Sequence, residues 1–157
     1  MSGPSGTGKT MTAAILANEL HLPLYVVLIE KVVTKFMGES SLKLSKVFDL
    51  IYQNQGVYLF DEFDAIGAHR GLENEVGEMR RILNSFLQFM ERDESDSIIV
   101  AATNSMSILD KALFRRFDDI IEYTLPTNDE KFRIMTNQLK DFLKKNFCYE
   151  EILPLMD

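Results

Sequence analysis

Dense apolar runs recur along the chain, separated by longer segments in which apolar residues are spaced differently. Four of these runs are short and rich in β-branched or aromatic residues, a pattern that predicts buried strands. They lie at residues 24–29, 57–60, 98–102 and 120–123. Because a segment of helical length lies between most successive runs, the pattern favours a largely parallel sheet.

The segments between the runs place apolar residues three and four positions apart, which is typical of helices with one buried face. The clearest of them, 75–91, has apolar residues at Val76, Met79, Ile82, Leu83, Phe86, Leu87 and Met90. Further helices are predicted at 9–20, 41–53, 110–115 and 129–145. Strands that alternate with helices along the chain predict the α/β fold class.

Composition is compatible with such a fold and narrows the functional classes. The chain has 157 residues, 46% hydrophobic and 26% charged, which is enough for one domain with a core. Its net charge of −7 disfavours a protein that coats nucleic acid, because phosphate backbones repel an acidic surface. One cysteine and two histidines exclude a multi-cysteine metal site and the HExxH motif of zinc proteases.

The sequence gives no sign of a membrane segment or of a targeting leader. No apolar run reaches the roughly 18 residues that a membrane helix needs. Residues 1–4 are neither basic nor apolar, and the single cysteine fits a reducing compartment. We therefore expect no membrane segment in this chain and a cytoplasmic location.

The first segment with recognisable chemistry opens the chain. It matches the pattern GxxxxGK[ST] in full, with Gly3, Pro4, Ser5, Gly6, Thr7, Gly8, Lys9 and Thr10. The glycines let backbone N–H groups converge on an anion, and the following helix adds the positive end of its dipole. We expect Lys9 to contact the phosphates of ATP or ADP and Thr10 to hold Mg²⁺, with Met11 completing the nucleotide-binding set. A glycine-rich turn that only caps a helix would explain the glycines but not the Lys-Thr pair.

Two of the predicted strands end in polar residues, and parallel sheets bind ligands at the carboxyl ends of their strands. Asp61 and Glu62 follow the run 57–60, and Asn104 comes soon after the run 98–102. We expect Asp61 to bind Mg²⁺, Glu62 to orient and polarise an attacking water, and Asn104 to contact the γ-phosphate or that water. The alternatives are an exposed acidic turn and a turn-forming asparagine.

Two adjacent arginines, Arg115 and Arg116, precede the last predicted strand. They could form a solvated face, or one of them could reach the phosphates of a neighbouring subunit as an arginine finger.

The segments 3–10, 59–62, 101–104 and 109–118 have the order and compatible spacing of Walker A, Walker B, sensor-1 and arginine-finger segments, and the chain resembles the AAA ATPases. The resemblance implies a P-loop NTPase core of three α/β/α layers that binds Mg-ATP. It also implies hydrolysis at the subunit interfaces of a homo-oligomeric ring, usually a hexamer. The family separates its two arginines, whereas here they are adjacent; Arg116 is favoured as the finger because it directly precedes Phe117 and Asp118.

A further resemblance concerns what the ring would act on. Residues 35–40 are similar to the first pore loop of the family. In that reading Phe36 and Met37 face a central channel and grip a polypeptide, while Gly38 supplies the bend. The alternative is that Phe36 packs on the body of the domain.

The resemblance divides the chain into a nucleotide-binding core at 1–126 and the start of a small helical lid at 127–157. In the family a central strand precedes the P-loop, whereas only Met1 and Ser2 precede Gly3 here. We expect this to leave two unpaired edges in the sheet. The chain also ends before the place of the family's sensor-2 arginine, and we expect these residues to be a fragment of a longer AAA protein.

The resulting expectation is an AAA ATPase that remodels or unfolds protein substrates. One alternative is an AAA+ loader or helicase-like ATPase acting on DNA, which the acidic charge and the pore-loop resemblance disfavour. The other is a non-hydrolysing, nucleotide-dependent assembly module, which the presence of Lys9, Asp61, Glu62 and Asn104 together disfavours.

Overall fold

The computed structural model describes residues 1–33, 39–66, 73–105, 113 and 115–138. Two compact units, Met1–Tyr123 and Thr124–Asp157, make up the chain. The elements, in chain order, are α1 (Lys9–Glu19), β1 (Leu24–Leu28), α2 (Ile29–Val32), α3 (Glu39–Gln53), β2 (Val57–Asp61), the 3₁₀ helix η1 (Phe63–Ile66), α4 (Glu73–Arg92), β3 (Ile98–Ala101) and α6 (Asn128–Gln138).

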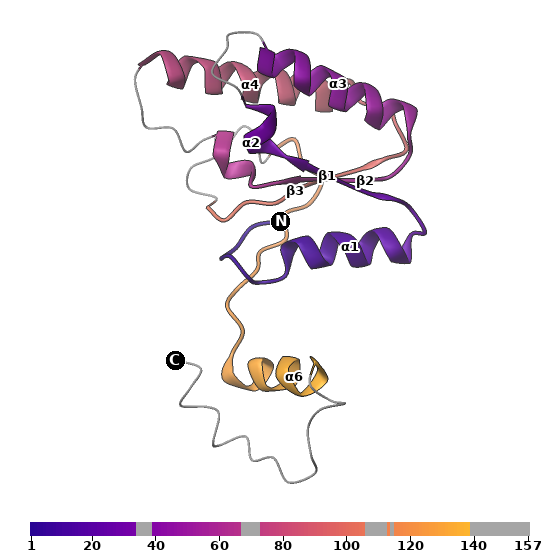
Figure 1. The fold of residues 1–157 in the computed structure, drawn as a ribbon, viewed down its shortest axis with the longest axis vertical. Coiled ribbons are helices and arrows are strands. Elements are labelled where there is room, and N and C mark those ends of the chain that lie inside the picture. Colours follow the sequence, from indigo (N-terminus) through magenta and orange to yellow (C-terminus); the bar gives the residue numbers. More distant parts are fainter. Residues whose placement is uncertain (34–38, 67–72, 106–112, 114, 139–157) are drawn as a thin grey trace. The chain divides into compact units, whose positions relative to one another are not determined.

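The strands of the first unit form a parallel sheet in the order β1-β2-β3, which confirms the predicted α/β class. Figure 1 shows α1 on one side of this sheet and α2, α3 and α4 on the other. Parallel neighbours place all three strand ends at the same edge, where β2 is followed directly by Glu62.

The central strand β2 is buried from Val57 to Phe60 without interruption, because helices cover both of its faces. Tyr58 and Phe60 point into the core beneath α3 and α4, where Phe60 and Phe86 lie 5.1 Å apart between ring centroids. Leu59 points to the opposite face and belongs to a smaller core that includes Ala13 of α1. The small side chains on the buried face of α1 let this helix lie close to the sheet, which brings its first turn to the edge where β2 ends.

The predicted strand at 120–123 is wrong as a strand, because among the described residues it makes only one isolated parallel bridge, from Glu122 to Ser2. Ser2 also forms a parallel bridge with Thr103, just beyond β3. The Ser2 N–H donates to the carbonyl of Ile121 at 2.8 Å, and the Tyr123 N–H donates to the carbonyl of Ser2 at 2.6 Å. The expectation of two unpaired edges is therefore corrected only at Ser2, which bridges Thr103 and Glu122. Along Ile98–Ala101, β3 is still an outer strand of the described three-stranded sheet.

Gly3 passes so close to Tyr123 that a side chain does not fit there. A Cβ atom would lie 2.2 Å from the Tyr123 carbonyl oxygen, and the φ angle of +151° is itself unfavourable for other residues. We expect Gly3→Ala to lower the free energy of unfolding by about 2–3 kcal/mol. The measurement is urea unfolding of the two proteins.

Gly77 provides the matched control for Gly3. It is exposed within α4, and a Cβ there would meet nothing within 4 Å. We expect Gly77→Ala to raise the free energy of unfolding by up to about 1 kcal/mol, because alanine favours helix over glycine. Equal unfolding midpoints for Gly3→Ala and the parent would contradict the steric argument.

One end of a predicted strand also needs correction. Ile29, predicted to be in a strand, begins the short helix α2, and its carbonyl accepts a hydrogen bond from the Val33 N–H at 2.9 Å. The side chain of Ile29 is nonetheless buried, and burial is what its apolar character reflects. Most of the helix predicted at 110–115, namely residues 110–112 and 114, and the part of the last helix beyond residue 138 fall outside the described residues.

In the second unit, α6 begins with a reciprocal cap between Thr127 and Glu130. The Thr127 N–H and hydroxyl donate to the Glu130 carboxylate at 2.8 and 2.9 Å, and the Glu130 N–H donates to the Thr127 hydroxyl at 3.3 Å. The pKa of the Glu130 carboxyl lies below its usual value because the carboxylate accepts these bonds from Thr127. The bond from the Thr127 N–H has the larger effect, and the bond from the hydroxyl has the smaller one. Within the described residues, none of the helices has the length and apolar character to cross a bilayer.

Candidate functional site

The glycine-rich loop curls between the pairing at Ser2 and the start of α1. Gly6 and Gly8 have φ angles of +78° and +95°, a left-handed conformation that glycine adopts without strain. The Thr7 hydroxyl donates to the Pro4 carbonyl at 2.8 Å and closes the loop on itself. Gly8 is the N-cap of α1, and the loop therefore ends on the N–H groups at the positive end of that helix.

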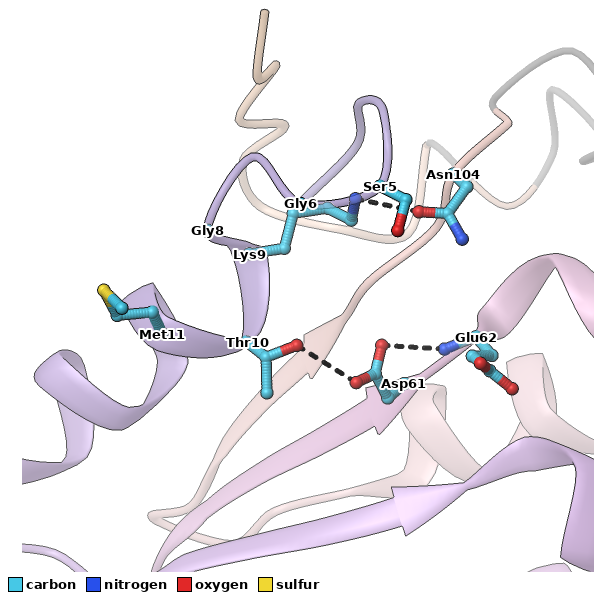
Figure 2. Close-up of a pocket in the computed structure, with 9 residues that line it drawn as sticks. All are labelled: Ser5, Gly6, Gly8, Lys9, Thr10, Met11, Asp61, Glu62 and Asn104. Carbon is cyan, nitrogen blue, oxygen red and sulfur yellow. Dashed lines mark hydrogen bonds between the residues drawn. The ribbon is translucent and has the colours of Figure 1, made fainter. Parts of the chain in front are cut away.

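Lys9 is nearly buried although its side chain carries a charge. Its ammonium donates to the carbonyls of Gly3 and Pro4 at 2.6 and 2.9 Å, and to the Asn104 side-chain oxygen at 2.9 Å. Figure 2 shows the contact with Asn104 across the mouth of the loop. Three oxygens thus hold the cation at the place where the loop would meet an anion.

The acidic pair lies beside the first turn of α1. The Thr10 hydroxyl donates to one carboxylate oxygen of Asp61 at 3.1 Å, and the Glu62 N–H donates to the other at 2.9 Å (Figure 2). Glu62 has a φ angle of +55°, which is unfavourable for a residue with a side chain and is often found at functional sites. Its carboxylate is exposed beside Asp61.

These side chains surround one cavity of about 330 Å³. The residues that line it are Ser5, Gly6, Gly8, Lys9, Thr10, Met11, Asp61, Glu62 and Asn104. Three other residues of the predicted nucleotide-binding set, Gly3, Pro4 and Thr7, contribute to the loop through the hydrogen bonds described above. The structure thus brings the ends of β2 and β3 together with the loop, as the parallel topology requires.

The oxygens of Thr10 and Asp61 fit a magnesium ion held partly by phosphate. Mg²⁺ is usually bound by one or two protein oxygens, with phosphate and water oxygens completing its shell. Within the described part of the chain, no group of three or more His, Cys, Asp or Glu could hold a metal by itself.

The remaining predicted site residues are not part of this cavity. Arg115 and Arg116 are exposed, and Arg116 forms an ion pair with Glu91 near the end of α4. The pore-loop residues Phe36, Met37 and Gly38 lie outside the described residues.

Sequence reasoning missed an acidic residue that contacts the cavity residue Asn104, and the acidic partner of Arg116. Asp64 accepts hydrogen bonds from the Thr103 hydroxyl and the Asn104 N–H, both at 3.2 Å. Glu91 is the partner of Arg116. The spacing of Asp64, three residues after Asp61, is a signal that could have suggested a role at the same edge, whereas nothing in the sequence pairs Glu91 with Arg116.

A glycine-rich loop that opens a helix, together with a buried lysine and an acidic residue ending a parallel strand, defines the P-loop class of nucleoside triphosphatases. Within this class, residues 1–125 match the profile of the ATPase family associated with various cellular activities (AAA). The chain belongs to the AAA family, and this membership implies nucleotide binding.

Curated relatives agree with this assignment. An uncharacterized AAA family ATPase, y4kL, of Sinorhizobium fredii is 38% identical over 124 residues, covering 79% of this chain and 38% of the relative. A putative 26S proteasome regulatory subunit homolog of Methanothermobacter thermautotrophicus is 31% identical, covering 98% of this chain and 42% of the relative. A proteasome-activating nucleotidase of Methanoculleus marisnigri is 39% identical, covering 85% and 34%. The chain thus spans less than half the length of each of these three relatives.

Proposed function

We propose that this chain binds Mg-ATP in the cavity and hydrolyses it. The observation that carries the proposal is the meeting, around one cavity, of a lysine, a hydroxyl–carboxylate pair, a second carboxylate and an amide. Lys9 and the loop N–H groups bind the phosphates, and Thr10 and Asp61 hold Mg²⁺. When bound, Mg²⁺ neutralises charge on the phosphate oxygens and orients them.

Glu62 accepts the proton that the attacking water loses, because its exposed carboxylate lines the same cavity. Asn104 contacts the γ-phosphate or that water through its side-chain amide. Lys9 has its donors directed at Gly3, Pro4 and Asn104, and these contacts hold the ammonium at the phosphate position before nucleotide arrives.

The wider assembly is a homo-oligomeric ring, usually hexameric in this family, with Arg116 or Arg115 entering the neighbouring subunit's site. An arginine in that position stabilises the charge that develops in the transition state. In this role Arg116 exchanges its ion pair with Glu91 for the neighbour's phosphate. Residues 1–126 form the nucleotide-binding core and 127–157 the start of the helical lid.

The substrate is a polypeptide gripped by Phe36, Met37 and Gly38. Support comes from the relatives named as proteasome-activating nucleotidase and as a 26S proteasome regulatory subunit homolog. Those names describe the relatives, and they favour action on proteins over action on DNA.

The test of this function is ATP-dependent unfolding of a fluorescent protein that carries an unstructured tail. We expect fluorescence to decay with ATP and the full chain, and to stay constant with Phe36→Ala at an unchanged ATPase rate. Steady fluorescence together with ATPase activity stimulated by DNA would instead support the loader or helicase-like alternative.

A further inference from the structure

Asp64 connects two segments of the site that are far apart in the sequence. It lies on η1, two residues after Glu62, and its half-buried carboxylate reaches the segment after β3. One oxygen, Oδ1, accepts from the Thr103 hydroxyl and from the Asn104 N–H, both at 3.2 Å. A carboxylate is a stronger acceptor than a neutral group, and bonds to it are correspondingly stronger.

Thr103 extends this contact to Ser105, the residue that follows Asn104. Its side chain is buried, and its hydroxyl oxygen accepts from the Ser105 N–H at 3.1 Å. The backbone of Thr103 is bonded as well, because its carbonyl accepts from the Gly3 N–H at 3.2 Å. The backbone on both sides of Asn104 is thus tied to Asp64 and to the start of the glycine-rich loop.

The side chain of Asn104, by contrast, is exposed at the cavity, where its oxygen accepts from Lys9. A bound phosphate competes for the Lys9 ammonium. Once Lys9 turns to the phosphate, the aim of the Asn104 amide depends on the backbone that carries it. An error of about 1 Å in the position of such a group can cost 100-fold in rate.

We propose that Asp64 is a positioning residue that holds the Asn104 amide in line with the γ-phosphate and the attacking water. This inference rests on the proposed function, because it assigns Asp64 a part in the same hydrolysis. Asp64 does not line the cavity, and it acts only through Thr103 and Asn104. The Asp64 carboxylate also holds η1 next to the residues that follow β3.

The first test separates kcat from KM in the full chain. We expect Asp64→Ala to lower kcat about tenfold or more while KM for ATP stays within about twofold. Asp64→Asn should restore most of kcat, because its amide oxygen can accept the same two bonds. Thr103→Val removes the hydroxyl that donates to Asp64, and we expect it to lower kcat as well. A change in KM alone, or no change in kcat in either Asp64→Ala or Thr103→Val, would overturn the proposal.

Asp93 offers a matched control, since its carboxylate also caps a turn. It accepts from the Ser95 N–H at 3.3 Å and from the Ser95 hydroxyl at 3.0 Å, in the turn before β3. This turn lies at the end of β3 opposite to Asn104. We expect Asp93→Ala to leave kcat unchanged. An equal loss of kcat in Asp93→Ala and Asp64→Ala would contradict the proposal, because Asp64 would then only stabilise a turn.

A double-mutant cycle asks whether Asp64 acts through Asn104. We expect Asn104→Ala to lower kcat, and Asp64→Ala to cause no further loss in that background. If the two losses multiply, Asp64 acts by another route and the proposal is wrong.

Amide hydrogen exchange tests the contact without relying on turnover. In the nucleotide-free protein, Asp64→Ala should speed exchange of the Asn104 N–H at least tenfold, with little change in the interior of β2. Unchanged exchange would overturn the proposal even in an active enzyme. A parent protein with a protected Asn104 N–H and no hydrolysis would instead count against the proposed function.

Discussion

Glu62→Gln is expected to lower the rate of ATP hydrolysis by about 100-fold or more and to leave ATP binding within about twofold of the parent. The substitution keeps the size of the side chain and removes its ability to take a proton. The Glu62 hydrogen bond to Asp61 comes from the backbone N–H, and the change leaves that bond in place. Since the side chain is exposed, its loss of charge should not disturb the core.

The measurement pairs steady-state ATP hydrolysis with equilibrium binding of a fluorescent ATP analogue. Glu94→Gln is the matched control, because Glu94 is also exposed but lies in the turn before β3, away from the cavity. We expect the control to hydrolyse ATP at the parent rate. Hydrolysis at the parent rate in Glu62→Gln itself would remove Glu62 from the mechanism.

Lys9→Ala is expected to weaken ATP binding by about 10- to 100-fold, because a hydrogen bond to a charged group contributes about 1.5–3 kcal/mol. The loss has a second consequence in the empty site. The carbonyls of Gly3 and Pro4 and the amide of Asn104 lose the ammonium that they share. We therefore also expect the loop to be less well ordered in the variant.

Binding titrations with ATP and ADP measure the first effect, and thermal unfolding measures the second. Lys31→Ala is the control for charge, since Lys31 is exposed on α2 and does not line the cavity. Lys9→Arg keeps the charge but differs in shape and donor geometry, and we expect it to bind ATP more weakly than the parent. Parent-like affinity in Lys9→Ala would contradict the assignment of the phosphate site.

The fold class could be predicted because burial leaves a mark on the sequence. In β2 an unbroken run of buried residues from Val57 to Phe60 precedes Asp61, and such a run indicates a strand covered on both faces. The parallel arrangement follows from the helices between the strands. Similarly, the glycine spacing before Lys9 follows from the way a loop must turn to surround an anion. Local patterns thus predict the residues that now line the cavity.

The contacts of Asp64 and Arg116 could not be predicted in this way. Asp64 meets Asn104 only because β2 and β3 are neighbours in the sheet and η1 turns back over the end of β3. The pairing of Ser2 with Thr103 and Glu122 is also long-range, and two residues before a glycine carry no strand pattern. Such contacts depend on the order of the strands, which hydrophobic spacing does not encode.

Some predictions stay as they were made from the sequence. The pore loop at Phe36 to Gly38 lies outside the described residues, and the choice between Arg115 and Arg116 as the proposed arginine finger stays a prediction. The ion pair of Arg116 with Glu91 makes that choice testable, because Glu91→Gln would release Arg116 and leave Arg115 unaffected.

The most direct test of the central claim is the rate of ATP hydrolysis per subunit across a range of protein concentrations, with Glu62→Gln measured in parallel. The account predicts a rate that rises with concentration, because neighbouring subunits complete each site, and that is lost in the variant at every concentration. A rate that persists in Glu62→Gln, or no hydrolysis at any concentration, would contradict it.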